Sequence, residues 1–271
     1  MWVQLIVFSA PKEGYRPAEW EDGACGGVFA AVGADDPSYG RFIVLDGASR
    51  SYEARRWVDL LISSFMPPAP DGGAGALPEL ETGSLTSWVR EMQDGWRSQL
   101  PTTSDYIEQR KISRGALATF LGGELMGLGG SAPSWRAAAL GDTVLFHVRA
   151  GRLLTQFPPL RSADFGMAPE GISTQRDRLG EVSDQMLFQQ GSLAVGDTLF
   201  AATDAFAKWM IKGTERRDKA LWPLLGSLTH HAVFTRLVAE QRKAGALEDD
   251  DVTLMRIRVT SSPPSALVVC L

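Results

Sequence analysis

The sequence predicts an α+β fold, a β-sandwich of two antiparallel sheets flanked by helices. Many short apolar stretches are bounded by Gly, Pro, Asp or Ser, which is typical of strands. Stretches with helical spacing are fewer. Many strands beside a few helices favour antiparallel sheets covered by helices. With 271 residues and 44% hydrophobic content, the chain is long enough to bury a sizeable core.

The expected strands are short and apolar. They lie at residues 3–8, 28–32, 41–45, 116–121, 135–140, 144–148, 198–202 and 252–259. Gly141-Asp142 predicts a tight hairpin between two of these strands, and Gly196-Asp197 predicts a turn before a third.

Three stretches predict helices, at residues 53–65, 85–100 and 228–244. The middle stretch carries Trp, Met and Trp at four-residue steps, and we expect this stripe to pack in the core. Gly245 is the expected C-cap of the last helix.

Two stretches predict loops, because they contain Pro and Gly and have no clear period: residues 67–78 and 158–184. Neither argues for a domain boundary. We therefore expect one domain over residues 1–260, followed by a C-terminal tail at residues 261–271.

Composition narrows the class of protein. The net charge is −5 and no long basic stretch occurs, which argues against a nucleic-acid partner. No apolar run is long enough to span a membrane, and the apolar N-terminal run lacks preceding basic residues, so we expect a first strand rather than a targeting segment. Cys25 and Cys270 form no Cys-x-x-Cys motif, which predicts neither a zinc site nor a disulfide framework. We expect a cytoplasmic protein.

The most informative feature is the position of acidic residues at strand ends. The apolar run 41–45 ends in Asp46-Gly47, and the run 198–202 leads to Asp204. The acidic run 248–251 comes immediately before a strand instead. If that strand is antiparallel to the other two, all three sets of acids reach one edge of the sheets. Glu21-Asp22, before another strand-like run, can join them.

Such a cluster favours divalent cations, because neighbouring carboxylates repel one another and raise one another's pKa. Oxygen ligands suit Mg²⁺ or Mn²⁺, and a glycine beside an acid lets a backbone carbonyl approach the ion. Two such ions can share a water and lower its pKa from about 16 toward neutrality. The pattern therefore predicts metal-dependent hydrolysis of phosphoesters.

These acids and their neighbours resemble the motifs of the PPM family of metal-dependent protein serine/threonine phosphatases, bacterial members especially. Five pieces occur in the family's order along nearly the whole chain. They are the acid pair in 21–24, the Asp-Gly motif in 44–48 with the helix after it, the small-residue strand and Gly-Asp hairpin in 115–119 and 135–143, the strand and acid in 196–204, and the terminal acids in 250–253.

The resemblance implies hydrolysis of phosphoserine or phosphothreonine on proteins by a water that bridges two divalent cations, Mn²⁺ or Mg²⁺. It implies a phosphorylated protein as partner, a target of a serine/threonine kinase. The implied metal ligands are Asp46, which bridges both ions, the Gly47 carbonyl, Asp204 and Asp250 on the first ion, Asp22 through water with Glu21 in support, and Asp142 for a third, weaker ion. The implied catalytic residues are Asp46, Asp204 and the phosphate-binding Arg16, which lies one position from the family's arginine. In position, residues 158–184 resemble the family's variable flap, a candidate for substrate selection.

Three departures from the family pattern keep another function open. Trp20 replaces the motif's asparagine, Ala205 replaces the glycine after the third acid, and Lys208 replaces an acid four residues after it. The alternative is a catalytically degenerate domain that binds a phosphoprotein or partner without turnover, and a small-molecule phosphatase is a third interpretation. Lys208, about one helical turn beyond Asp204, could supply the charge of the third ion.

Each acid also has an ordinary structural interpretation. Asp46-Gly47 could be a strand-ending turn, Asp204 a helix N-cap and Asp142 a hairpin residue. Asp250 could belong to a solvated loop, and Arg16 could be a surface arginine. The three histidines are too few for a histidine-rich metal site, and we expect them to be structural or exposed.

Overall fold

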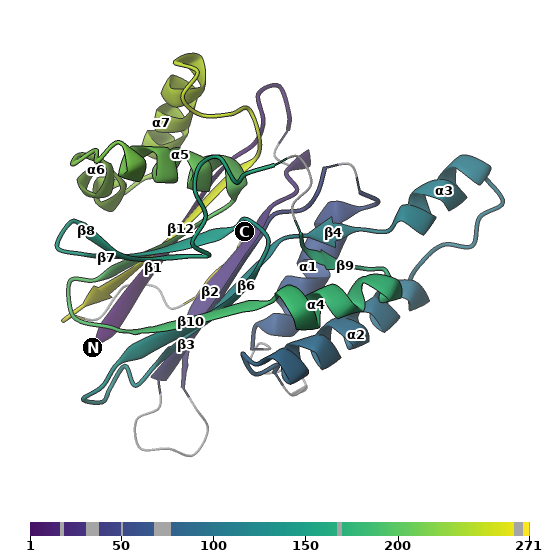
Figure 1. Cartoon of the computed structure of the whole chain (residues 1–271), viewed down its shortest axis with the longest axis horizontal. Coiled ribbons are helices and arrows are strands. Elements are labelled where there is room, and N and C mark those ends of the chain that lie inside the picture. Colours follow the sequence, from purple (N-terminus) through teal and green to yellow (C-terminus); the bar gives the residue numbers. More distant parts are fainter. Residues whose placement is uncertain are drawn as a thin grey trace.

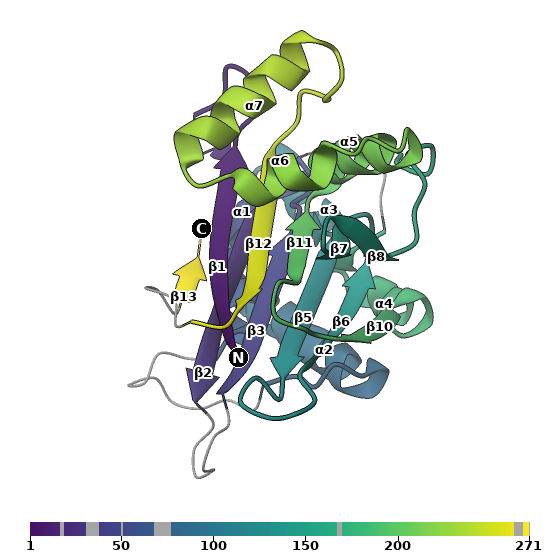
Figure 2. The same cartoon turned by 90° about the vertical axis from the view of Figure 1, so that its left-hand side faces the viewer.

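The structure is a computed structural model that describes residues 1–16, 19–30, 38–49, 51–67, 77–166, 170–262 and 268–270. Over these residues the chain forms two antiparallel sheets packed face to face, with helices on the outer face of each (Figures 1 and 2). The predicted fold class is confirmed. The prediction of one domain ending at residue 260 stays a prediction.

The first sheet has five strands in the order β1-β12-β11-β7-β8 among the described residues. They are β1 (Trp2–Ala10), β7 (Val144–Arg149), β8 (Arg152–Phe157), β11 (Thr198–Ala202) and β12 (Val252–Thr260). Its outer face is covered by α5 (Asp204–Glu215), α6 (Leu221–Ser227) and α7 (His231–Lys243), which lie together in Figure 1.

The second sheet has six strands in the order β10-β6-β5-β3-β2-β13, counted over the same residues. They are β2 (Gly23–Ala30), β3 (Ser38–Leu45), β5 (Phe120–Met126), β6 (Ser134–Leu140), β10 (Leu187–Ser192) and β13 (Val268–Cys270). Its outer face packs on α1 (Ala54–Phe65), α2 (Thr82–Ser98) and α4 (Leu179–Gln185). A small ladder joins β4 (Leu117–Ala118) to β9 (Ile172–Ser173), a 3₁₀ turn (Arg176–Arg178) precedes α4, and α3 (Tyr106–Arg114) projects away from the sheets (Figure 1).

Strand alternation produces the layers. In β3, Phe42 and Val44 point into the core between the sheets, whereas Ile43 and Leu45 point to the helices α1 and α2. A strand with both faces buried must be apolar throughout, which explains why residues 41–45 read as a continuous hydrophobic run.

The predicted hairpin at Gly141-Asp142 is wrong. β6 pairs with β5 and β10, whereas β7 pairs with β11 and β8, so the chain crosses from one sheet to the other at this turn. Gly141 has φ +105° there, and a Cβ at this position would lie 2.5 Å from the carbonyl oxygen of Glu170. The sequence signal for a tight turn was therefore correct, but the two strands it joins lie in different layers.

Polar side chains also connect the sheets at the end far from this turn. The indole N–H of Trp135 on β6 donates to Nδ1 of His147 on β7 (3.2 Å), and Nε2 of His147 contacts Asp197 (2.9 Å). Asp197 also accepts two hydrogen bonds from Arg149. The expectation of a structural His147 and exposed His230 and His231 agrees with this arrangement.

The remaining sequence predictions have mixed outcomes. The eight expected strands all occur, although the stretch 116–121 is divided between β4 and β5. The elements β8, β9, β10, β13, α3, α4 and α6 were not anticipated. Gly245 ends α7 with φ +67°, as expected. Most of the predicted loop at 67–78 and much of the tail at 261–271 lie outside the described residues. The described part of 158–184 contains β9 and α4, so it is not wholly irregular.

The backbone brings the chain's two cysteines to one place. Cys270 on β13 lies opposite Cys25 on β2, and there is no free cysteine in the part of the chain that the structure describes. Cys25 is disulfide-bonded, so the expectation that the cysteines form no disulfide is wrong. Among the described helices, none has the length and apolarity required to cross a membrane.

Candidate active site

The predicted acids lie at one rim of the sandwich. Asp46 directly follows β3, and Asp204 opens α5 two residues after β11 ends. Asp250 and Asp22 stand just before β12 and β2, the strands antiparallel to β11 and β3. Asp142 occupies the crossover between β6 and β7. Because strand ends and strand starts alternate in an antiparallel arrangement, all five acids reach the same edge.

Asp46 lies at the electrostatic centre of this rim. Burial, followed by repulsion from Asp22, Asp204, Asp142 and Asp250, raises the pKa of Asp46 well above its usual range. Its backbone is fixed on both sides, because its N–H donates to the hydroxyl of Thr119 (3.1 Å) and its carbonyl accepts from the N–H of the same residue (2.9 Å). The carboxylate is therefore held in place beside four other acids.

The pKa values of two further acids of the rim, Asp204 and Asp142, are also raised. Burial and then repulsion from Asp250 raise the pKa of Asp204 to about 6. Burial and then repulsion from Asp204 raise the pKa of Asp142 to about 7. Asp142 is 6% exposed, and its buried Oδ1 has no hydrogen-bond partner among the residues that the structure describes. Buried carboxylate oxygens in proteins are normally paired, so this oxygen keeps acceptor capacity that its described neighbours leave unused.

Asp22 is held by hydroxyl groups from the opposite sheet. Thr203 and Thr253 donate to its Oδ2 at 2.9 and 2.7 Å. Burial raises the pKa of Asp22 well above its usual range, with the charges of Asp251 and Asp204 in the same direction and the two hydroxyls opposing them. Asp22 thus ties the start of β2 to β11 and β12.

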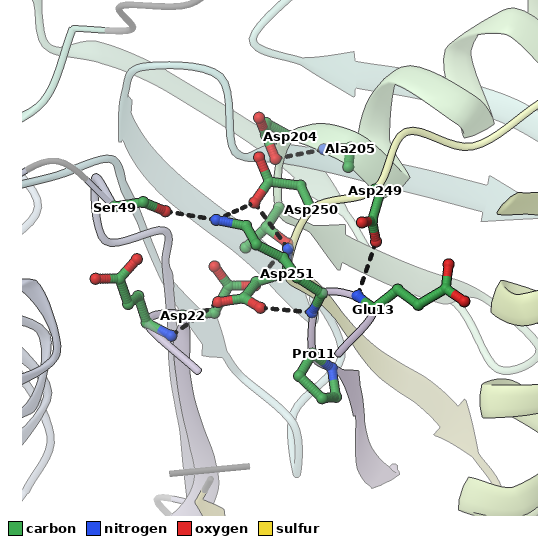
Figure 3. A network of polar contacts seen from close by, with 12 residues as sticks. Pro11, Glu13, Asp22, Ser49, Asp204, Ala205, Asp249, Asp250 and Asp251 are labelled. Atoms are coloured by element: carbon green, nitrogen blue, oxygen red, sulfur yellow. Dashed lines mark hydrogen bonds and ion pairs between the residues drawn. The ribbon is translucent and has the colours of Figure 1, made fainter. Parts of the chain in front are cut away.

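The acidic run before β12 separates into structural and available members. Asp251 is buried and accepts hydrogen bonds from the backbone N–H groups of Lys12 and Glu21, both at 2.9 Å. Asp249 accepts from the backbone N–H of Glu13 at 2.9 Å (Figure 3). Asp250 instead contacts the ammonium of Lys12 and accepts from the backbone N–H of Asp251, both at 2.8 Å, and its choice as the ligand within this run stays a prediction.

A lysine that the sequence did not bring to attention stands in the rim. The ammonium of Lys12, in the loop after β1, lies 2.8 Å from Oδ1 of Asp250 and donates to Oγ of Ser49 at 2.6 Å. Burial lowers the pKa of Lys12, but the hydrogen bond and charge of Asp250 outweigh burial and leave it raised. Glu21 lies in the same neighbourhood, where burial raises its pKa while Ser49 and Lys12 oppose that shift.

Gly47 is buried where a side chain has no room. A Cβ at this position would lie 2.6 Å from the carbonyl oxygen of Glu21 and 3.2 Å from Cβ of Ala54. Gly47 also forms a bridge with Ala118, next to Asp46. The glycine thereby lets the backbone after β3 pass close to the Glu21 segment.

Arg16 is not brought into the rim. It is exposed in the loop after β1, where its backbone N–H donates to Oε2 of Glu19 at 2.8 Å. Arg55 on α1 is closer to the acids: it donates to the backbone carbonyl of Asp22 (2.8 Å), and its guanidinium lies over the ring of Trp20 at 5.0 Å. The tryptophan that replaces the motif's asparagine is thus a packing partner of this arginine.

A pocket of about 300 Å³ adjoins the rim on the side of α5. Its lining residues are Phe165, Gly166, Asp204, Lys208 and Glu248. Lys208 donates to Oε1 of Glu248 at 2.6 Å, so its charge is already paired. The segment 158–184 contributes the first two lining residues. Ala205, by contrast, is buried in the core under α5.

The rim fits a divalent cation by the chemistry of its donors, although it is not arranged as a finished ligand set. Within the described ranges, no group of three or more His, Cys, Asp or Glu side chains is positioned to hold an ion. Two threonine hydroxyls donate hydrogen bonds to Asp22, and Lys12 forms an ion pair with Asp250. The crowded carboxylates and the unpaired Oδ1 of Asp142 are nevertheless the hard oxygen donors that Mg²⁺ and Mn²⁺ prefer.

Sequence reasoning missed the residues that support the acids. Thr203 and Thr253 stand directly next to predicted strand ends, so the alternation of the strands could have placed them beside Asp22. Lys12 follows the first strand by two residues, a position that reaches the same rim. Ser49 carries no signal in the sequence, because its role depends on the loop conformation after β3.

Comparison with known proteins agrees with this architecture. No protein-family model and no curated protein sequence matches the chain. Solved structures do. The catalytic domain of the serine threonine protein phosphatase PstP, in complex with two manganese ions, matches with a TM-score of 0.55 at 16% identity, over 96% of this chain and 99% of that one.

Two other solved structures match over a similar share of both chains. A bacterial serine phosphatase gives a TM-score of 0.59 at 12% identity over 96% of this chain and 99% of its own. PppA, a key regulatory component of T6SS in Pseudomonas aeruginosa, gives 0.53 at 15% identity over 95% and 98%. The chain therefore has the fold of the PPM-type serine/threonine phosphatases over nearly its whole length.

Proposed function

We propose that this chain, built on the PPM-type phosphatase fold, hydrolyses phosphoserine or phosphothreonine on proteins with the help of bound Mn²⁺ or Mg²⁺. The observation that carries the proposal is the convergence of Asp22, Asp46, Asp142 and Asp204 on one rim, where burial and repulsion from neighbouring acids raise the pKa of all four. Such repulsion is relieved when divalent cations bind.

The residues that would hold the ions are those that face the rim. We assign this role to Asp46, Asp204, Asp250, Asp142 and the carbonyl of Gly47. Asp22 supports them from beneath through Thr203 and Thr253. Divalent ions in such a site neutralise phosphoryl oxygens and lower the pKa of a bound water toward neutrality.

The protein's own contribution is positioning. The two hydrogen bonds between Asp46 and Thr119 fix the acid after β3, and the first turn of α5 fixes Asp204. The pocket lined by Phe165, Lys208 and Glu248 adjoins Asp204 and offers space for the substrate beside the phosphate. We assign substrate selection to this pocket and place the reaction in the cytoplasm, on targets of a serine/threonine kinase.

One observation favours a second function. Lys12 already pairs with Asp250, and the family's third-ion acid is replaced by Lys208, itself paired with Glu248. A rim neutralised by its own lysines could bind a phosphoprotein without turnover. The degenerate domain is therefore the alternative that the experiment must distinguish.

The test is hydrolysis of an aryl phosphate and of a phosphoserine peptide, with and without Mn²⁺. We expect Mn²⁺-dependent turnover in the wild type and a loss of at least about 100-fold in Asp46→Asn, because a carboxylate that binds both ions cannot be replaced by an amide. Asp249→Asn is the matched control, since Asp249 is a neighbouring acid whose contacts are with the backbone N–H of Glu13 and the guanidinium of Arg242.

The outcomes separate the candidates. Equal losses in Asp46→Asn and Asp249→Asn would contradict the assigned site. Absence of turnover with any substrate, together with measurable binding of the phosphopeptide to the wild type, would replace the enzyme with the degenerate binding domain.

A further inference from the structure

Lys12 is a positive charge built into the rim itself. Its ammonium contacts Oδ1 of Asp250 at 2.8 Å and Oγ of Ser49 at 2.6 Å, and Figure 3 shows these two contacts as dashed lines between the labelled Ser49 and Asp250. The lysine side chain is only 17% exposed, whereas that of Asp250 is 44% exposed. The lysine is therefore the more deeply placed member of the pair.

The backbone fixes where this lysine starts. The N–H of Lys12 donates to Oδ1 of the buried Asp251 at 2.9 Å, so the loop after β1 is tied to the residue next to Asp250. The carbonyl of Pro11 accepts from Arg242 on α7 at 2.8 Å, which holds the same loop from the other side. The flexible four-carbon arm of Lys12 thus begins at a fixed point beside the acids.

As a result, the acids of the rim differ in whether a positive charge lies next to them. Asp250 has a cationic partner, whereas the buried Oδ1 of Asp142 has no hydrogen-bond partner within the described part of the chain. A divalent cation that enters the rim meets unneutralised carboxylates on the side of Asp142 and Asp204, and an ammonium group already in contact with the carboxylate on the side of Asp250.

We propose that Lys12 is a tethered cation that competes with the divalent ion for Asp250. An ion binds Asp250 only when the ammonium leaves it, so Lys12 weakens binding of the ion on this side and stabilises the rim when no ion is there. This inference rests on the proposed function only in that it requires the rim to bind a cation; it holds for an active enzyme and for a binding domain alike.

The decisive measurement is Mn²⁺ binding by titration calorimetry to the full chain, beside Lys12→Met. Methionine keeps much of the length and apolar character of the lysine stem but removes the charge. We expect Lys12→Met to bind Mn²⁺ about tenfold more tightly at its weaker step, which corresponds to about 1.4 kcal/mol, because the ammonium no longer repels the ion or holds Asp250. Thermal unfolding without metal should be lowered, because Asp250 loses its partner.

Two further variants make the result specific. Lys12→Arg keeps the positive charge and should bind Mn²⁺ as the wild type does. Lys219→Met removes one exposed positive charge outside the rim, and it too should leave Mn²⁺ binding unchanged. Unchanged or weaker Mn²⁺ binding in Lys12→Met, with the native circular dichroism spectrum retained, would overturn the proposal.

A second measurement uses the wild type and is independent of how the variant folds. Labelling with an amine-reactive reagent, read by mass spectrometry, should modify Lys12 faster at saturating Mn²⁺ than without metal, while Lys219 stays constant. A rate at Lys12 that stays equal or falls refutes displacement. Asp46→Asn tests separately whether the rim binds Mn²⁺. If Asp46→Asn loses Mn²⁺ binding while Lys12→Met binds Mn²⁺ as the wild type does, the competition by Lys12 is refuted but the metal site is not.

Discussion

At the scale of single residues, the rim depends on hydroxyl groups as much as on carboxylates. Oδ2 of Asp22 accepts hydrogen bonds from both Thr203 and Thr253, and all three side chains are buried. A buried carboxylate without such donors is costly, because nothing replaces the water that it loses on folding. The two threonines therefore make it possible for the fold to keep an acid at this position.

Replacing Thr253 by valine should destabilise the protein by about 1–3 kcal/mol, because the shape is kept while a buried carboxylate loses one donor. Urea denaturation of the metal-free protein measures this difference. Thr235→Val is the matched control, since the hydroxyl of Thr235 only bonds the carbonyl of Ala232 within α7; it should change stability by less than about 0.5 kcal/mol. Equal effects of the two substitutions would contradict the role of Thr253.

The pKa of a second buried acid, Asp197, is lowered, in contrast to that of Asp22. Burial raises the pKa of Asp197, but hydrogen bonds from Arg149, His147 and the N–H of Ala194 outweigh burial and leave it below its usual range. The indole N–H of Trp135 can only donate, so Nδ1 of His147 must accept it, and Nε2 of His147 carries the proton that points to Asp197.

This lowered pKa predicts how stability depends on pH. The contribution of Asp197 is fully present above its unfolded pKa of about 3.9 and is lost as the pH falls through its lower folded pKa. Wild type should therefore exceed Asp197→Asn in unfolding free energy at pH 7, and the gap should narrow below about pH 4. Urea denaturation of both proteins from pH 3 to 7 measures the gap, and a constant gap over that range contradicts the assignment.

At the scale of elements, the turn between β6 and β7 carries an acid and changes sheets at once. Gly141 has φ +105°, and an added Cβ would lie 2.5 Å from the carbonyl oxygen of Glu170 and 2.9 Å from Cβ of Thr119. The position of Asp142 thus depends on the absence of a side chain at the residue before it.

Gly141→Ala should lower the free energy of unfolding by clearly more than Gly151→Ala does. Both glycines have positive φ, but a Cβ at Gly151 meets nothing within 4 Å, so alanine there costs only backbone strain of about 1–2 kcal/mol. Gly141→Ala adds a clash with backbone to that strain. Urea midpoints of the two variants decide the matter, and similar midpoints would show that the crossover adapts.

The elements that the sequence predicted are those with a strong apolar signal. β3 was found because both of its faces are buried, whereas β10 was missed because most of its residues are exposed at the edge of a sheet. β5 was truncated at Gly122 and Gly123, which have low strand propensity. The structure explains these glycines, since a Cβ at Gly123 would lie 2.1 Å from the ring of Phe42.

At the scale of the whole molecule, the meeting of the acids could be predicted and their partners could not. Antiparallel order alone brings Asp46, Asp204 and Asp250 to one edge, and order is readable from strands and turns. Lys12 enters the site through its side-chain conformation, which no periodicity reports. The wrong hairpin at Gly141 has the same origin, because a turn signal does not say in which sheet the next strand lies.

The rim also lies where the two sheets meet. Asp22 and Asp46 come from one layer of the sandwich, and Asp204 and Asp250 come from the other. Separating the two sheets at this end would move the carboxylates apart, so binding of the proposed cation and the packing of the two sheets are thermodynamically linked. By linkage, a ligand that binds only when the two sheets are packed together raises the free energy needed to separate them.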